Sequence, residues 1–179
     1  VVVGVAVMAV AVAGCRNDRD QRGAERWAVT HNTNVKIDWD KINEAYKKAE
    51  GPEDFEKKVN EIYEGTEIVS VSVQDESDTA QVVTGFFDEN NDGSVQEPER
   101  IFSIKRSLED SSNARYQISG HGHYHGYHSP FWTLTSSMMM GAMVSRMFMP
   151  GYSPMYRSAY VTSPGRSAAL RSHRSTYQA

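Results

Sequence analysis

One stretch of the chain carries oxygen-bearing side chains at regular intervals around a central glycine, Gly93. Carboxylate, amide and carbonyl oxygens are the ligands that a hard divalent cation such as Ca²⁺ prefers, and the ion needs about six to eight of them. The glycine lets the backbone turn sharply enough for both halves of the stretch to face one ion. Such oxygens are carried by the side chains of Asp88, Asn90, Asp92, Gln96 and Glu99. These residue types at this spacing predict a calcium site.

The twelve residues from Asp88 to Glu99, DENNDGSVQEPE, resemble the calcium-binding loop of the EF-hand family. The resemblance implies that side chains at the first, third and fifth positions ligate the ion, that the glycine forms the turn, and that the final glutamate binds through both oxygens. It also implies a backbone carbonyl ligand at Ser94 and a direct or water-mediated contact at Gln96. The alternative is a plain Asp-Gly hairpin turn, which explains neither end of the motif.

The flanks of the loop differ from the EF-hand pattern. An EF-hand loop lies between two helices and pairs with a second loop, whereas here the residues on both sides alternate like strands, Pro98 falls in the exit, and the sequence contains no second such loop. The resemblance covers 12 of 179 residues. It implies calcium ligation without the helix opening of calcium sensors. An unpaired loop of this kind is expected to bind weakly, with a dissociation constant on the order of 0.1 to 1 mM.

Two helices are expected ahead of the loop. In residues 38–50 apolar side chains recur at helical spacing after Asp38, a good N-cap, and before Gly51. In residues 52–65 they recur again, with a proline in the first turn and a glycine at the end. The short connection predicts an antiparallel helical hairpin that buries one apolar face.

The apolar period then changes from helical to alternating, which indicates strands. The expected strands are residues 69–73, 80–87, 101–106 and 116–119. Consecutive short strands favour an antiparallel sheet packed against the helices. The predicted fold class is therefore α+β: a helical hairpin followed by a small antiparallel sheet, with the calcium loop between strands and a disordered C-terminal tail.

The last third of the chain begins with a tract rich in His, Gly and Tyr. If this tract is extended, His121, His123 and His125 project on one face and could share a Zn²⁺, Cu²⁺ or Ni²⁺ ion. No carboxylate is near in the sequence to orient the rings, so a solvated linker is the alternative. The candidate second metal ligands are His121, His123, His125 and His128.

Charge divides the chain into an acidic core and a cationic tail. Residues 36–110 hold nine Lys or Arg and 20 Asp or Glu, whereas residues 111–179 hold six Arg and no acid. The Arg-rich tail suits an anionic component of a cell envelope, and an exported location disfavours nucleic acid as a partner. For the Met-rich residues 131–149, contact with a lipid interface or a partner and packing onto the domain remain alternatives.

An apolar run near the start of the sequence ends in a cysteine. Residues 1–14 contain only Val, Ala, Gly and Met, which is typical of the apolar part of a secretory signal and is short for a membrane span. We expect further residues, with a charged segment, to precede Val1. Residues 12–15, VAGC, resemble the lipobox of bacterial lipoproteins, in which the cysteine is lipidated and becomes the N-terminus. Because Cys15 is the only cysteine of the 179 residues, no disulfide can form within them.

These patterns predict a calcium-binding, lipid-anchored protein of a bacterial cell envelope with a structural or interaction role, held at the membrane by Cys15. The sequence has no Gly-x-Ser-x-Gly motif and no phosphate-binding glycine loop, so we do not expect an enzyme. A periplasmic transition-metal protein using the His tract and an envelope enzyme are the alternatives. The expected parts are a lipoprotein signal segment (1–15), a tether (16–35), an α+β domain (36–119) and a His/Met/Arg-rich low-complexity tail (120–179).

Overall fold

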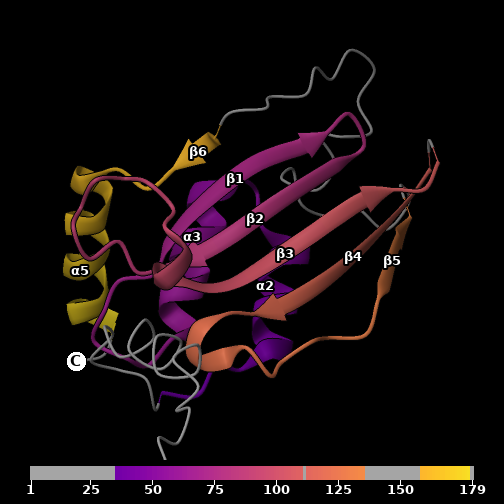
Figure 1. The fold of residues 1–179 in the computed structure, drawn as a ribbon. Helices are drawn as coiled ribbons and strands as arrows, with labels where there is room; N and C mark the ends of the chain where they lie inside the picture. Colours follow the sequence, from indigo (N-terminus) through magenta and orange to yellow (C-terminus); the bar gives the residue numbers. More distant parts are fainter. Residues whose placement is uncertain (1–34, 111, 136–157, 178–179) are drawn as a thin grey trace, which may run out of the picture.

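The computed structural model describes residues 35–110, 112–135 and 158–177. Within these ranges the chain has an α+β fold, with three α-helices and one antiparallel sheet of six strands. Figure 1 shows α2 (Trp39–Lys48) and α3 (Pro52–Ile62) behind the sheet and α5 (Pro164–Tyr177) at one end of it. The predicted α+β class is confirmed.

Local signals explain where α2 and α3 begin. The Asp38 carboxylate accepts a hydrogen bond from the backbone N–H of Lys41 at 3.1 Å, which satisfies one of the free donors in the first turn of α2. Pro52 occupies the first turn of α3, where its missing N–H is not needed. Each helix turns one apolar face inward, and Tyr46 and Phe55 are completely buried there.

The sheet is a meander with one returning strand. Its strands are β1 (Ser70–Ser77), β2 (Ala80–Phe86), β3 (Arg100–Leu108), β4 (Asn113–Gly120), β5 (Trp132–Thr135) and β6 (Ser158–Val161). The order across the sheet is β5-β4-β3-β2-β1-β6, so β6 lies beside β1 at the opposite edge from β5. The helices cover one face, and Figure 1 views the sheet from the other, open face.

Alternating residues of the strands build the core beneath the helices. Val73, Val83, Ile104 and Ile118 are successive cross-strand partners from β1 to β4, and each is buried. Burying one such side chain contributes about 1.5–3 kcal/mol. This row makes the central strands the most firmly held part of the sheet.

A polar row lies beside this apolar row, on the same face. The Gln81 side chain donates to Asp75 Oδ1 at 2.9 Å and accepts from Arg106 Nη2 at 2.8 Å, so that one amide links a buried acid and a buried base. The hydroxyl of Tyr116 donates to Asn43 Oδ1 of α2 at 2.5 Å. Burial raises the pKa of Tyr46 on α2, and the positive charge of Arg106 partly opposes this effect. These contacts pair the polar groups that burial would otherwise penalise.

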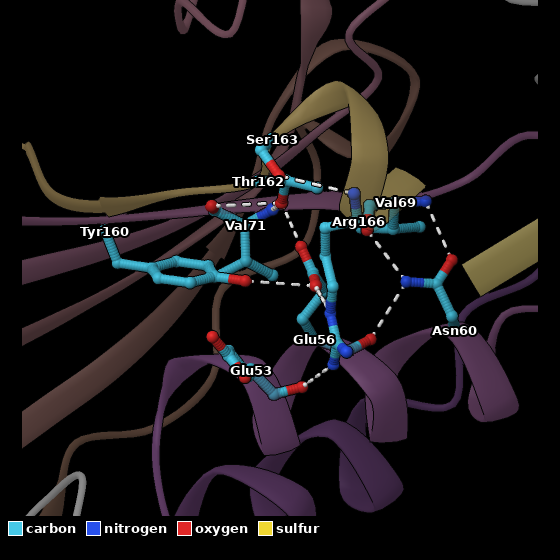
Figure 2. A network of polar contacts seen from close by, with 9 residues as sticks. All are labelled: Glu53, Glu56, Asn60, Val69, Val71, Tyr160, Thr162, Ser163 and Arg166. Carbon is cyan, nitrogen blue, oxygen red and sulfur yellow. Dashed lines mark hydrogen bonds and ion pairs between the residues drawn. The ribbon is translucent and has the colours of Figure 1, made fainter. Parts of the chain in front are cut away.

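A buried carboxylate on α3 attaches the C-terminal elements to the rest of the fold. Figure 2 shows Glu56, which is fully buried, receiving hydrogen bonds from the Thr162 hydroxyl, from Tyr160 OH at 3.1 Å and from Arg166 Nε at 3.0 Å. Thr162 also donates its N–H to the carbonyl of Val71 at 3.1 Å. The segment from β6 to α5 therefore docks on both β1 and α3.

The C-terminal region differs from the prediction of a disordered, low-complexity tail. Within residues 120–179, the described parts include β5, β6 and α5. The reason is non-local: Glu56 lies over 100 residues before its partners on β6 and α5, and no periodicity within the tail reveals such a partner. Residues 136–157 lie outside the described residues, as does most of the Met-rich range 131–149.

Candidate metal centre

The twelve-residue loop from Asp88 to Glu99 connects β2 to β3, two adjacent strands of the sheet. The backbone N–H of Phe87 donates to the carbonyl of Glu99 at 2.9 Å, and Phe86 pairs with Arg100 in the ladder. Both ends of the loop are thus held together by the sheet. The backbones of Asp88 and Glu99, the first and last candidate ligands, are therefore held near one another independently of the conformation of the loop between them.

The carboxylate of Asp88 organises the interior of the loop. Its two oxygens accept the backbone N–H groups of Asp92 and Gly93, each at 3.1 Å. Asp92 N–H is also 3.0 Å from Asn90 Oδ1, and Asp92 Oδ1 accepts from the N–H of Ser94 at 2.7 Å. Asp88 and Asn90, two of the candidate ligands, are therefore linked to a third, Asp92, through its backbone N–H.

The backbone adopts left-handed conformations at two positions of this turn. The φ angles are 55° at Asn91 and 69° at Gly93. Asparagine and glycine are the residues that adopt this region most readily. A side chain at position 93 would be strained in this conformation, which explains the glycine without reference to a ligand.

Three acids of the loop influence one another. Partial burial raises the pKa of Glu99, and the charges of Asp88 and Asp92 raise it further, against hydrogen bonds from backbone N–H groups. The pKa of Asp92 is lowered, chiefly by the hydrogen bond from the N–H of Ser94 and then by the Asn90 and Gln96 amides. The repulsion felt by Glu99 is the kind that a divalent cation would relieve.

The donor chemistry of the loop fits calcium, whereas its side-chain positions fit only in part. All six candidate ligands offer oxygen, the atom that calcium prefers. However, Asn90 and Gln96 direct their amide nitrogens at the Asp92 carboxylate, at 2.9 and 3.0 Å, so each amide must rotate to present its oxygen. In the described ranges, no three acidic, imidazole or thiol groups are arranged to hold a metal ion. The acidic side chains would therefore have to move closer together for all the ligands to meet at one ion.

The histidines of the tract contact different groups. His121 Nε2 lies 2.8 Å from Ser103 Oγ, His125 Nδ1 lies 3.0 Å from the carbonyl of Gly122, and His128 Nδ1 lies 3.2 Å from Ser119 Oγ. The ring of His123 packs edge-on against Tyr124. The tract includes the short 3₁₀ helix η2 (Gly122–Tyr124), so it is not extended throughout as the shared-face arrangement requires.

Arginines of the described tail serve the fold. Arg166 pairs with Glu56, and Arg174 donates to the backbone carbonyls of Tyr63, Gly65 and Glu67. These two cations are therefore used inside the molecule, whereas Arg171 is exposed. Cys15 and the tether 16–35, apart from Val35, lie outside the described residues.

A cavity on the open face of the sheet was not foreseen from the sequence. Its volume is about 550 Å³, and alternate residues of β1, β2 and β3 form its floor. Gly93, Ser94 and Val95 of the calcium-loop candidate line it too. Polar residues at every second position of the strands were a signal for the open face, but nothing in the pattern showed that the loop would border it.

Comparison of the chain with family models, curated proteins and solved structures found no match. Among the residues that the structure describes, no helix is both long and apolar enough to cross a lipid bilayer.

Proposed function

We propose that this protein is a calcium-binding, lipid-anchored component of a bacterial cell envelope with a structural or interaction role. The observation that carries the calcium part is the loop Asp88–Glu99. Adjacent strands hold its ends together, Asp88 draws the backbone of the turn inward, and two further carboxylates lie within electrostatic reach. Calcium would relieve the repulsion among these acids and stabilise the closed loop.

The residues that would hold the ion are those of the motif. Asp88, Asn90, Asp92 and Glu99 would contribute side-chain oxygens, Ser94 its carbonyl, and Gln96 a direct or water-mediated contact. The loop connects two strands of the sheet rather than two movable helices, which favours a structural ion over a switch. A dissociation constant on the order of 0.1 to 1 mM would suit a location where calcium is abundant.

Calorimetric titration with calcium tests the proposal. The protein should release or absorb heat at millimolar calcium. Asp92→Asn should weaken calcium binding by about tenfold or more because it removes a charged ligand. Asp110→Asn is a matched control, since Asp110 also accepts backbone N–H groups in a turn, from Ser112 at 2.7 Å and Asn113 at 2.9 Å. Equal heats for Asp92→Asn and wild type would remove the calcium assignment.

The envelope address is supported by the lipobox-like residues 12–15 and the apolar run before them. When the protein is expressed from its own gene in a bacterial host, it should incorporate a radiolabelled fatty acid and sediment with membranes. Cys15→Ser should abolish both, because the cysteine sulfur is the atom that would be bonded to the diacylglyceryl lipid. Label retained by Cys15→Ser would show that this residue is not the anchor.

A transition-metal role for the His tract is the alternative function. The four imidazoles contact separate groups in the described structure, so no observation favours it over calcium. Zinc titrated into the same sample supplies the comparison: binding that survives Asp92→Asn and disappears when the four histidines are replaced would support the alternative.

A further inference from the structure

The cavity on the open face of the sheet has a polar floor made by one cross-strand row. Ser72, Thr84 and Ser103 are successive partners in β1, β2 and β3, so their hydroxyls lie side by side. Ser72 is only 3% exposed and Thr84 8% exposed, although they lie on the face away from the helices. The row is therefore sheltered at the bottom of a recess of about 550 Å³.

Basic side chains border the same recess. Arg100, Lys105 and His121 line it together with one acid, Glu76. His121 is held against the floor by its 2.8 Å contact with Ser103 Oγ. An arrangement of hydroxyl donors with two cationic groups, Arg100 and Lys105, is complementary to a small anion that also carries hydroxyl groups.

The cations are not firmly committed to other partners. Arg100 pairs with Glu97 at 3.2 Å and Lys105 pairs with Glu76 at 2.6 Å. All four of these side chains are at least 38% exposed, and ion pairs in such positions contribute little to stability. An anion that enters the recess can therefore compete for the arginine and the lysine at small expense to the fold.

The calcium-loop candidate forms one wall of the cavity. Gly93 to Val95 line the recess, while Asp88, Asp92 and Glu99 belong to the same short loop. Without calcium these acids add negative potential near the recess, which opposes an anion. With calcium bound their charge is offset, so that two sites on one loop are coupled.

We propose that this recess binds a small hydroxylated organic anion, such as a sugar acid or a sugar phosphate, and that calcium in the neighbouring loop increases its affinity. The second half rests on the calcium site proposed above, whereas the first half does not. Each ligand would raise the affinity for the other by the same factor, as linkage requires.

Titrations with glucuronate and with glucose 6-phosphate test the recess, and glucose serves as the neutral comparison. The amide chemical shifts of the protein report the binding. Either anion should shift the amide signals of Ser72, Thr84, Ser103 and His121, and calcium should lower the dissociation constant of the anion by about fivefold or more. The carboxylate and phosphate probes distinguish which anionic group is preferred. Glucose binding as tightly as both anions would overturn the assignment to anions.

Variants of the lining separate this site from general surface charge. Lys105→Gln or Arg100→Gln should weaken the anion by about tenfold, because each removes a charged hydrogen-bond donor. The matched control is Arg115→Gln: Arg115 is exposed on β4, pairs with Glu109 at 2.7 Å, and does not line the recess. Equal weakening by Arg115→Gln would overturn the proposal.

The outcomes distinguish this inference from the proposed function. If calcium binds and neither anion shifts the lining amides, the recess proposal is wrong while the calcium site stands. If the anions bind in chelator and calcium produces no heat, the calcium site and the coupling are wrong while the recess stands. Calcium binding that leaves anion affinity unchanged would overturn the coupling alone.

Discussion

At the scale of single residues, the Asn60 side chain pairs both backbone polar groups of Val69, the residue before β1. It is 1% exposed on α3, its Oδ1 accepts the N–H of Val69 at 2.9 Å, and its Nδ2 donates to the carbonyl of Val69 at 2.8 Å. A third bond, from Nδ2 to the carbonyl of Glu56, fixes the amide on its own helix. The side-chain amide thus makes the two hydrogen bonds to Val69 that a neighbouring strand would otherwise make.

Asn60→Ala should therefore destabilise the domain by about 2–4 kcal/mol, because it leaves both backbone groups of Val69 buried and unpaired. Urea unfolding followed by circular dichroism measures the change. Gln117→Ala is the comparison, since Gln117 is half-buried and makes one 2.8 Å bond to the carbonyl of Ser129; its effect should be below about 1.5 kcal/mol. Similar losses in both variants would contradict this role for Asn60.

His121 predicts a pH dependence of stability. Burial lowers its pKa, the charge of Arg100 lowers it further, and Glu97 opposes them. Below the ordinary histidine pKa the unfolded state binds the proton more readily than the folded state, so the contribution of His121 is present at neutral pH and is lost as pH falls through its lowered pKa.

The difference in melting temperature between wild type and His121→Gln should therefore shrink as the pH falls from about 7.5 to 5. His125→Gln, which changes an exposed ring in the same tract, is the comparison variant. A His121→Gln difference that stays constant over this range would show that the histidine titrates alike in both states.

At the scale of elements, β6 and α5 are attached through Glu56. Glu56→Ala should destabilise the domain by about 2–4 kcal/mol, because Thr162 and Tyr160 lose their acceptor while the partly exposed Arg166 can recover water. Hydrogen exchange should show the largest loss of protection in β6 and α5. Glu53→Gln on the exposed side of α3 is the control and should change stability by less than about 0.5 kcal/mol. Protection lost equally across the whole sheet would instead indicate that the C-terminal elements unfold only with the core.

At the scale of the whole molecule, calcium should stabilise the domain through the sheet. The loop connects β2 and β3, and these strands carry Val83 and Ile104, the two middle members of the buried row. Calcium at tenfold excess over its dissociation constant adds about 1.4 kcal/mol to the free energy of unfolding. For a domain of this size the melting temperature should rise by roughly 3–8 °C. Thermal melts in calcium and in chelator measure the shift, and magnesium at the same ionic strength is the control; identical midpoints in all three would contradict the proposed stabilisation.

The local parts of the fold could be predicted because their signals lie within a few residues of one another. Asp38 caps α2 through a residue three positions away, and Pro52 begins α3. The alternation of valines revealed β1, although the prediction stopped at residue 73 and the strand continues to Ser77. The loop Asp88–Glu99 was recognised from its residue types alone, since its turn depends on the conformations of its own asparagine and glycine.

By itself the sequence determined the α+β class, the order of the helices and first four strands, and the position of an oxygen-rich loop, because helix caps, apolar periods and tight turns are short-range properties. Only the tertiary structure decided that residues 120–179 would supply β5, β6 and α5, that Glu56 would be buried against β6 and α5, and that Ser72, Thr84 and His121 would share a recess bordered by the loop. The physical reason is that these features depend on contacts between residues far apart in the chain. The residues next to a buried ionisable group in the sequence do not indicate which distant residue will pair with that group.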